Sequence, residues 1–398
     1  MTGPEPTSPP LDLAAILGDP GVGVVVCCGA GGVGKTTTAA ALALYAAERG
    51  RRVVVLTIDP ARRLAQSMGL TELDNTPRPV AGVDTSAGGS LDAMMLDMKR
   101  TFDEVVLTHA EPEKAREILD NPVYQAVSSS FAGTQEYMAM ERLGQLRQQA
   151  GAEGTWDLIV VDTPPSRSAL DFLDAPARLG SFLDGRFIRL LTAPARVGGR
   201  ASLRLFGTGM SLVNATLGRL LGRQLLTDVS TFVMAMDTVF GGFRARAEQT
   251  FALLQDKRTR FVVVATPERD ALREAGYFVQ RLARDGMPLA GLVLNRVTVT
   301  RAPLSPGRAL AAAEALEELA GDAPPPGEGD EEWTERHTAA LLRTHADRAE
   351  LAARQRQLIR GVAAAHPQLP TAQVPAAAGD IADLDGLRSV AADLTRTG

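Results

Sequence analysis

Short apolar runs alternate with longer amphipathic stretches over most of this chain. The runs are rich in Val, Ile and Leu and hold few polar residues, so each fits a strand that is buried on both faces. Strands of this kind separated by helices are typical of a parallel sheet with helices on both sides. The pattern predicts an α/β fold with a doubly wound, mostly parallel sheet, in which ligands bind beyond the carboxyl ends of the strands. The predicted strands are 22–28, 52–58, 92–97, 156–162, 260–266, 290–295 and a weaker one at 372–375.

Two stretches, 99–150 and 168–250, depart from this alternation because their patterns are helical almost throughout. They are too long to be crossover helices, so we expect a helical lobe inserted into the fold. Residues 1–10 are rich in proline and are expected to form a flexible tail. Because no internal repeat is present, residues 11–398 are expected to form a single domain. Loops are predicted at 76–90 and 321–332, and a long amphipathic helix at 333–366.

The composition argues against several classes of protein. The 398-residue chain has a formal charge of −5, which does not suit a dedicated nucleic-acid binder. We find no signal peptide and no uncharged apolar stretch of the roughly 18 residues that a membrane span requires, so a cytoplasmic protein is expected. The two cysteines, Cys27 and Cys28, are too few for a disulfide framework or a four-cysteine zinc site. As neighbours on a strand they should face opposite ways, and we expect both to be buried apolar residues.

Only four of the 42 basic residues are lysines, and one of them completes the clearest motif of the chain. Residues 29–36 read G-A-G-G-V-G-K-T and match G-x-x-x-x-G-K-[ST], between a predicted strand and a helix. The glycines let backbone N–H groups converge on a phosphate, and the start of the helix adds positive potential. Lys35 is placed to reach the β- and γ-phosphates, and the Thr36 hydroxyl to bind Mg²⁺. The weaker alternative is a glycine-rich turn that only begins a helix.

Two aspartates follow predicted strands at the same edge of the sheet. Asp162 ends the strand 156–162, where its carboxylate can hold Mg²⁺ directly or through water. Asp59 follows the strand 52–58, where a carboxylate can orient the water that attacks a γ-phosphate. Each has a structural alternative, because aspartates at strand ends are common and Asp59 can cap a helix that has Pro60 at its first position.

Three segments resemble the ArsA-type ATPases, the deviant P-loop family that includes the arsenite-pump ATPase and the tail-anchored-protein targeting ATPase. These segments are G-A-G-G-V-G-K-T-T-T from Gly29, V-L-T-I-D-P-A from Val55, and D-T-P-P-S-R-S-A-L-D-F-L-D-A-P from Asp162. They are similar to the family's P-loop, switch I and switch II. The likeness runs from about residue 20 to 390 and is weakest in the helical lobe and in 300–360. Further matches are F-A-G-T-Q-E-Y-M-A-M at 131–140, L-N-R at 294–296, and V-P followed by D-I-A-D-L within 374–384.

The resemblance implies a dimeric ATPase that uses ATP and Mg²⁺, with its two nucleotides facing each other across the interface. It makes Asp59 the residue that positions the attacking water, with Lys35 as the second catalytic residue. The metal would be held by Thr36, Asp59 and Asp162. Phosphate binding falls to Gly31, Gly32, Val33, Gly34, Lys35, Thr36 and Thr37.

The same resemblance places adenine near the last two predicted strands. Asn295 would hydrogen-bond the base, and the backbone at Val374 and Pro375 would flank it. For Asn295 the alternative is a simple turn residue at the end of a strand.

The chain departs from the family at three places. The family's P-loop carries a signature lysine at its second position, which reaches the partner's phosphates across the dimer, whereas this chain has Ala30. Losing such a cation lowers the rate by on the order of 10³ or more. A homodimer is therefore expected to be a weak ATPase unless Arg62, Arg63 or another arginine substitutes, and a heterodimer with a lysine-bearing paralogue would restore half of the sites. The zinc-binding Cys-x-x-Cys of the targeting ATPase and the metalloid-binding cysteines of the arsenite pump are both absent, so neither structural zinc nor arsenite transport is expected.

The predicted helical lobe is basic and contains many methionines. Between Gly185 and Thr227 there are seven arginines and no acidic residue. Because Met-rich helices suit varied apolar clients, and the targeting ATPase holds transmembrane segments in this lobe, a hydrophobic or membrane-protein client is one hypothesis. The favoured alternative is a packed lobe with buried methionines and solvated arginines. A basic amphipathic helix on anionic lipid, which would place the protein peripherally at the membrane, is a third.

Two functions stay open at this point. The leading hypothesis is a Mg²⁺-dependent ATPase switch whose hydrolysis opens and closes a dimer and so gates the helical lobe. The rival is a nucleotide-binding subunit, nearly inactive alone, that completes a heterodimer. Ala30 separates them, because only the rival needs the missing lysine to come from another chain.

Overall fold

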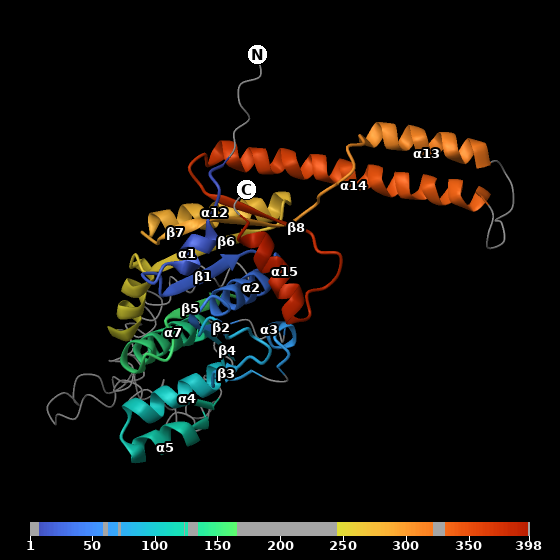
Figure 1. Cartoon of the computed structure of the whole chain (residues 1–398). Coiled ribbons are helices and arrows are strands. Elements are labelled where there is room, and N and C mark those ends of the chain that lie inside the picture. Colours follow the sequence, from blue (N-terminus) through green and yellow to red (C-terminus); the bar gives the residue numbers. More distant parts are fainter. Residues whose placement is uncertain are drawn as a thin grey trace, which may run out of the picture.

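An eight-stranded sheet forms the centre of the computed structural model, in the order β3-β4-β2-β5-β1-β6-β7-β8 (Figure 1). All neighbouring strands are parallel except β3 and β4, which confirms the predicted fold class. The strands are β1 (Val24–Gly29), β2 (Arg52–Thr57), β3 (Arg78–Pro79), β4 (Ser90–Met95), β5 (Leu158–Asp162), β6 (Thr259–Ala265), β7 (Leu289–Val297) and β8 (Thr371–Pro375). The structure describes residues 8–58, 63–70, 73–122, 124–125, 134–164, 245–320 and 331–396.

The strand β3 is the one element of the sheet that the sequence pattern misses. It lies inside the predicted loop 76–90 and pairs two residues, Arg78 and Pro79, antiparallel with Ala93 and Asp92 of β4. A proline cannot donate to a ladder and is tolerated at the edge of a sheet. The pairing partner, and not the local sequence, therefore creates this strand.

Helices cover both faces of the sheet, and each face has its own apolar core. Cys27 and Cys28 of β1 point into different cores and are both buried, as predicted. One core joins the sheet to α1 (Leu13–Gly18), α2 (Lys35–Ala47), α3 (Arg63–Ser67) and α15 (Leu384–Leu394). The other joins it to α4 (Met98–His109), α5 (Pro112–Asp120), α7 (Thr134–Glu153), the helix at 245–255 and α12 (Arg269–Arg284).

The predicted helical lobe is described only in part. The segment 99–150 contains α4, α5 and α7, which pack in the core against the sheet, whereas most of 168–250 lies outside the described residues. Met94, Met138 and Met140 are buried in the core against the sheet, so these methionines are packing residues. The methionines at 210, 234 and 236 lie outside the described residues. No helix in the described part of the chain has the length and apolarity that a membrane span needs.

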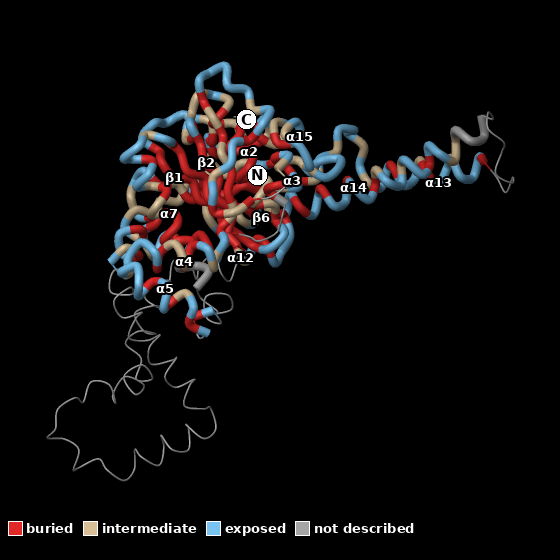
Figure 2. The backbone as a smooth tube through the Cα atoms, turned by 90° about the horizontal axis from the view of Figure 1, so that it is seen from below, coloured by how far each residue is buried: buried red, intermediate tan, exposed pale blue. Residues whose placement is uncertain are grey.

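A long helical hairpin follows β7. It consists of α13 (Pro306–Ala320) and α14 (Glu331–Ala365), and it extends away from the sheet (Figures 1 and 2). The α14 helix, with 35 residues, is roughly 50 Å long and matches the helix predicted at 333–366. Buried alanines such as Ala313 and Ala346 line the inside of the hairpin, and Arg343 pairs with Glu317 at 2.6 Å. The other end of α14 packs on the sheet beside α12.

Candidate functional site

The loop between β1 and α2, residues 29–36 (the P-loop), needs glycine at two points for reasons of space. Gly29 has φ +149°, and a Cβ there would lie 2.1 Å from the carbonyl oxygen of Val264 on the neighbouring strand. Gly34 precedes α2 with φ +95°, and a Cβ there would lie 2.3 Å from the side-chain nitrogen of Asn295. The backbone can make these close approaches only without side chains. The result is a loop whose Gly31 and Gly32 are exposed at the carboxyl edge of the sheet.

Lys35 is the first residue of α2 and lies against the P-loop itself. It is 7% exposed, and its Nζ donates a hydrogen bond of 2.8 Å to the carbonyl oxygen of Ala30. A cation is thus held beside the N-terminal end of a helix, where two sources of positive potential add. The methyl group of Ala30 is buried.

Asp162 collects hydroxyl groups from two neighbouring elements. It ends β5 and is fully buried. Its Oδ2 accepts hydrogen bonds from Thr36 Oγ1 at 2.7 Å and from Thr57 Oγ1 at 2.9 Å. The parallel register of β2 and β5 places Thr57 directly beside it. The structure therefore brings the predicted Mg²⁺ residues Thr36 and Asp162 into contact.

Thr57 belongs to this cluster although the sequence analysis did not single it out. The signal was a lone hydroxyl near the end of the otherwise apolar strand β2, beside the end of β5. Thr163 is a second hydroxyl residue of the site that the sequence analysis did not single out. Its Oγ1 donates a hydrogen bond of 2.9 Å to the carbonyl oxygen of Cys27. It ties the segment after β5 to β1.

Asn295 lies on the other side of the P-loop. Its Nδ2 donates a hydrogen bond of 2.8 Å to the carbonyl oxygen of Val33, and its Oδ1 accepts one of 2.9 Å from the backbone of Arg296. Arg296 lies within β7 and has φ +58°, at the point where the pairing of β7 with β8 shifts register between Leu294 and Val297. An asparagine amide has two N–H donors and two oxygen lone pairs, so these two bonds leave capacity for a ligand.

Val374 and Pro375, on β8, lie at the same edge of the sheet, on the far side of β7. Pro375 pairs with Val297, and the backbone N–H of Ala376 donates to the Val297 carbonyl. Val374 is 2% exposed and belongs to the apolar core, so its side chain is a packing residue.

The predicted catalytic Asp59 lies outside the described residues, as does Arg62. The residue before it, Ile58, is buried, and its backbone N–H donates a hydrogen bond of 3.0 Å to the Asp162 carbonyl. The chain therefore leaves β2 beside the carboxylate of Asp162.

The two thiols of β1 are kept protonated. Burial raises the pKa of Cys27 well above its ordinary value, and the Asp162 carboxylate raises it further. Burial raises the pKa of Cys28 to about 12, although Lys35 partly opposes this. Since the thiolate is the nucleophile, neither thiol is poised for nucleophilic catalysis. No three His, Cys, Asp or Glu side chains of the described residues come together as a metal site.

The comparisons with known proteins fit this geometry. A family model described as anion-transporting ATPase matches residues 22–303, which include the P-loop, Asp162 and Asn295. The chain belongs to this ArsA-type ATPase family. The match ends before α13, so the hairpin and β8 follow the region that the family model covers.

Its relatives within the family are distant. The chain is 26% identical over 271 residues to the arsenical pump-driving ATPase of Acidiphilium multivorum, a match that covers 68% of this chain and 38% of that protein. It is 27% identical over 289 residues to ATPase GET3B of Arabidopsis thaliana, covering 68% and 62%. With ATPase get3 of Neurospora crassa the identity is 26% over 296 residues, covering 74% and 77%. The chain thus spans well under half of the pump ATPase and less than two thirds of GET3B.

Proposed function

We propose that this ArsA-family chain binds Mg²⁺–ATP between the P-loop and Asp162 and hydrolyses it as the switch of a dimer. The observation that carries the proposal is the Asp162 carboxylate held by Thr36 and Thr57 beside a P-loop whose lysine is buried against the loop. Family membership supports the hydrolysis of ATP by such a site.

The residues of the site fit a magnesium ion that arrives with its nucleotide. Mg²⁺ prefers oxygen ligands, keeps several waters, and is held by one or two protein groups plus substrate phosphates. Thr36 supplies a hydroxyl and Asp162 a carboxylate to hold it. A bound Mg²⁺ would neutralise charge that develops on the phosphate oxygens.

The chain's own groups divide the remaining work. The backbone N–H groups of the P-loop, with Thr37, bind the phosphates, and Lys35 neutralises them. Asp59 is proposed to orient the attacking water. Asn295, which already holds the P-loop through Val33, is proposed to contact adenine, with the backbone of Val374 and Pro375 beside the base.

The second candidate function is a weakly active nucleotide-binding subunit of a heterodimer. Ala30 favours it, because its methyl group is buried and only its carbonyl takes part, in holding Lys35. An alanine cannot reach the phosphates of a partner subunit, so a sister chain would have to provide that cation.

ATP affinity and turnover of the full chain test both candidates. Lys35→Ala should weaken Mg²⁺–ATP binding by about 100-fold or more, because it removes the cation from the phosphate site. Lys257→Ala, at an exposed lysine far from the P-loop in sequence, is the matched control and should change nothing. If Lys35→Ala binds ATP as tightly as the wild type, the site is wrongly assigned.

Ala30→Lys then separates the switch from the heterodimer subunit. If the missing cation limits the homodimer, this variant should raise turnover by roughly 10- to 1,000-fold, provided that its free energy of unfolding matches the wild type. Brisk turnover by the wild type with no gain in Ala30→Lys would contradict the incomplete site.

We propose a hydrophobic client from two observations. They are the arginines of 185–227 and the methionines at 210, 234 and 236 in the sequence, all outside the described residues, and the similarity to ATPase GET3B. A synthetic Leu/Ala transmembrane peptide should bind the full chain in a nucleotide-dependent way. Binding that is the same with ATP, with ADP and without nucleotide would contradict a client role.

A further inference from the structure

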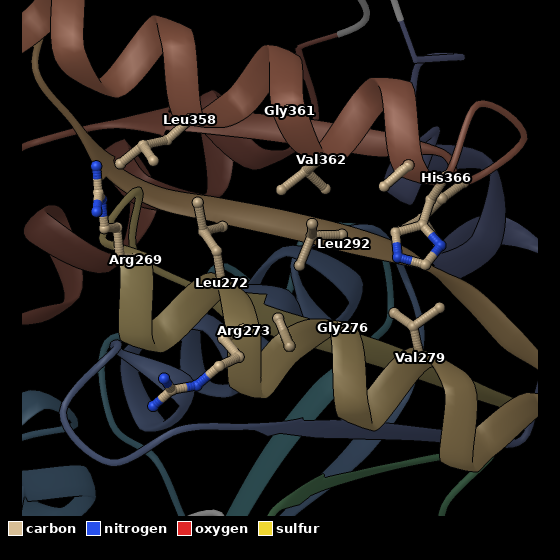
Figure 3. Close-up of a pocket in the computed structure, with 13 residues that line it drawn as sticks. Arg269, Leu272, Arg273, Gly276, Val279, Leu292, Leu358, Gly361, Val362 and His366 are labelled. Atoms are coloured by element: carbon tan, nitrogen blue, oxygen red, sulfur yellow. The ribbon is translucent and has the colours of Figure 1, made fainter.

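An apolar groove lies between α12 and the sheet-packed end of α14, on the face of the sheet opposite α2 (Figure 3). Leu272 and Val279 of α12 form one wall, and Leu358 and Val362 of α14 form the other. Leu292 of β7 lies between them. The groove has a volume of about 290 Å³, close to the lower limit of roughly 300 Å³ that is usual for small-molecule sites.

Two glycines face this groove from its opposite walls. Gly276 of α12 and Gly361 of α14 both line it, and a Cβ at either position would meet nothing within 4 Å. Glycine is unfavourable inside a helix, and larger residues at these two positions would fill the hollow. The groove is therefore open because the sequence places its smallest residue on both walls.

Charge is unequally distributed along the groove. Arg269, at the start of α12, and Arg273 lie at one end, and His366 lies at the other (Figure 3). Arg273 pairs with Asp270 at 3.1 Å, whereas Arg269 forms no ion pair with any residue that the structure describes. The exposed Glu268 is the other carboxylate next to it in sequence. Arg269 is thus the cation at this end that stays available to a ligand.

We propose that the groove binds a single-chain anionic amphiphile, of which a medium- to long-chain fatty acid is the type, with its anionic head at Arg269. The wall from Arg269 to Val279 is about 15 Å long at 1.5 Å per residue, the length of a medium-length acyl chain. The small volume suits one slender chain and excludes lipids with two. This site lies on the other face of the sheet from α2 and goes beyond the proposed ATPase function.

A chain-length series of saturated fatty acids tests the proposal on the nucleotide-free full chain. Calorimetric titration with octanoate, decanoate, dodecanoate and tetradecanoate, all below their micellar concentrations, should give one site per chain. Affinity should rise about tenfold for every two methylenes that become buried, and it should level off once the chain fills the groove. No saturable binding, or a rise that never levels off, would overturn a groove of this size.

Three variants locate the ligand. Gly361→Leu should abolish dodecanoate binding because its side chain fills the groove, whereas Gly361→Ala should weaken it less than threefold. Gly276→Leu repeats the test from the other wall in case the first variant unfolds. Wild-type affinity in a folded Gly361→Leu or Gly276→Leu variant would overturn the location.

The head group is tested separately. Arg269→Ala should weaken dodecanoate binding about tenfold and leave dodecanol binding unchanged, while Arg284→Ala, an exposed arginine on the same helix, should affect neither. Dodecyl phosphate compared with dodecanoate tells a phosphate head from a carboxylate head. Equal loss of dodecanol and dodecanoate in Arg269→Ala would overturn the role of the cation.

Discussion

Two basic residues, the partly buried Arg51 and the buried Lys35, lie near opposite edges of the sheet and differ in what surrounds them. Arg51 precedes β2 at the amino edge and makes five hydrogen bonds to the chain. Its guanidinium donates hydrogen bonds to Asp157, to the side-chain Oδ1 at 2.6 Å and to the backbone carbonyl oxygen at 2.8 Å. It also donates to the carbonyl oxygens of Leu17, Asp19 and Val22 at 2.8 to 3.0 Å.

Lys35, at the carboxyl edge, is held by the loop on which it lies, through the Ala30 carbonyl. Arg51 joins three segments that are far apart in sequence, so its contacts hold the fold together. The bond from Lys35 to the Ala30 carbonyl spans five residues and so fixes only the P-loop. We propose that the phosphates of a nucleotide also contact Lys35. The amino edge thus stabilises the molecule, and the carboxyl edge is where we propose that a ligand binds.

The largest expected effect is on stability, at the amino edge. Arg51→Ala removes hydrogen bonds to the backbone carbonyls of Leu17, Asp19, Val22 and Asp157 and an ion pair with the Asp157 carboxylate, so the free energy of unfolding should fall by about 3–5 kcal/mol. Arg52→Ala is the matched control. Arg52 is half exposed and lies 3.6 Å from the same carboxylate, so its loss should cost less than about 1 kcal/mol. Urea denaturation measures both, and similar losses in the two variants would break the comparison.

Lys35→Ala should have the opposite effect, with a large loss of ATP affinity and a small change in stability. ATP affinity should fall by about 100-fold, equivalent to about 2.7 kcal/mol, while the free energy of unfolding without nucleotide changes by less than about 1 kcal/mol. The hydrogen bond to the Ala30 carbonyl is lost, and removal of a buried cation offsets part of that loss. A loss of stability as large as that of Arg51→Ala would make Lys35 a structural residue.

The sequence pattern was informative wherever the determinants are local. Continuous apolar runs located seven strands of the sheet, and the spacing of glycines and Lys35 located the P-loop. Asp162 was expected to bind metal from its position at the end of a strand. These features depend on neighbours in sequence, so no knowledge of the tertiary structure was required.

Features that depend on distant partners were not predictable in this way. Thr57 shares the carboxylate of Asp162 only because β2 and β5 pair in a particular register. The role of Arg51 depends on carbonyl groups of two other segments, 17–22 and Asp157 just before β5, that meet it at one edge, and β3 exists because β4 offers an edge. The resemblance to the family indicated Asn295 as a nucleotide-binding residue, but only the structure shows its hydrogen bond to the Val33 carbonyl.

The next smaller effect lies within the P-loop. Gly34 has a left-handed backbone conformation, and an alanine Cβ there would also clash with the Asn295 side chain. Gly34→Ala should therefore lower the free energy of unfolding by about 2 kcal/mol. Gly32→Ala, with φ +74° and nothing within 4 Å of its Cβ, is the control and should lower it by about 1 kcal/mol. In an Asn295→Ala background the penalty of Gly34→Ala should shrink toward that of Gly32→Ala. Full additivity would contradict a direct contact between Gly34 and Asn295.

The smallest effect concerns pH and the thiols of β1, the strand that leads to the P-loop. Because the pKa of Cys27 and that of Cys28 are raised in the folded protein, the unfolded thiols ionise first, near pH 8.5. Above that pH the unfolded state binds fewer protons than the native state, so stability falls as pH rises, by about 1 kcal/mol per thiol between pH 7.5 and 9.5. The Cys27→Ala/Cys28→Ala variant should show a correspondingly flatter decline in urea denaturation over this range. The outcome that would contradict this account is a decline that is equally steep in the Cys27→Ala/Cys28→Ala variant, because groups other than the thiols of β1 would then cause the loss of stability.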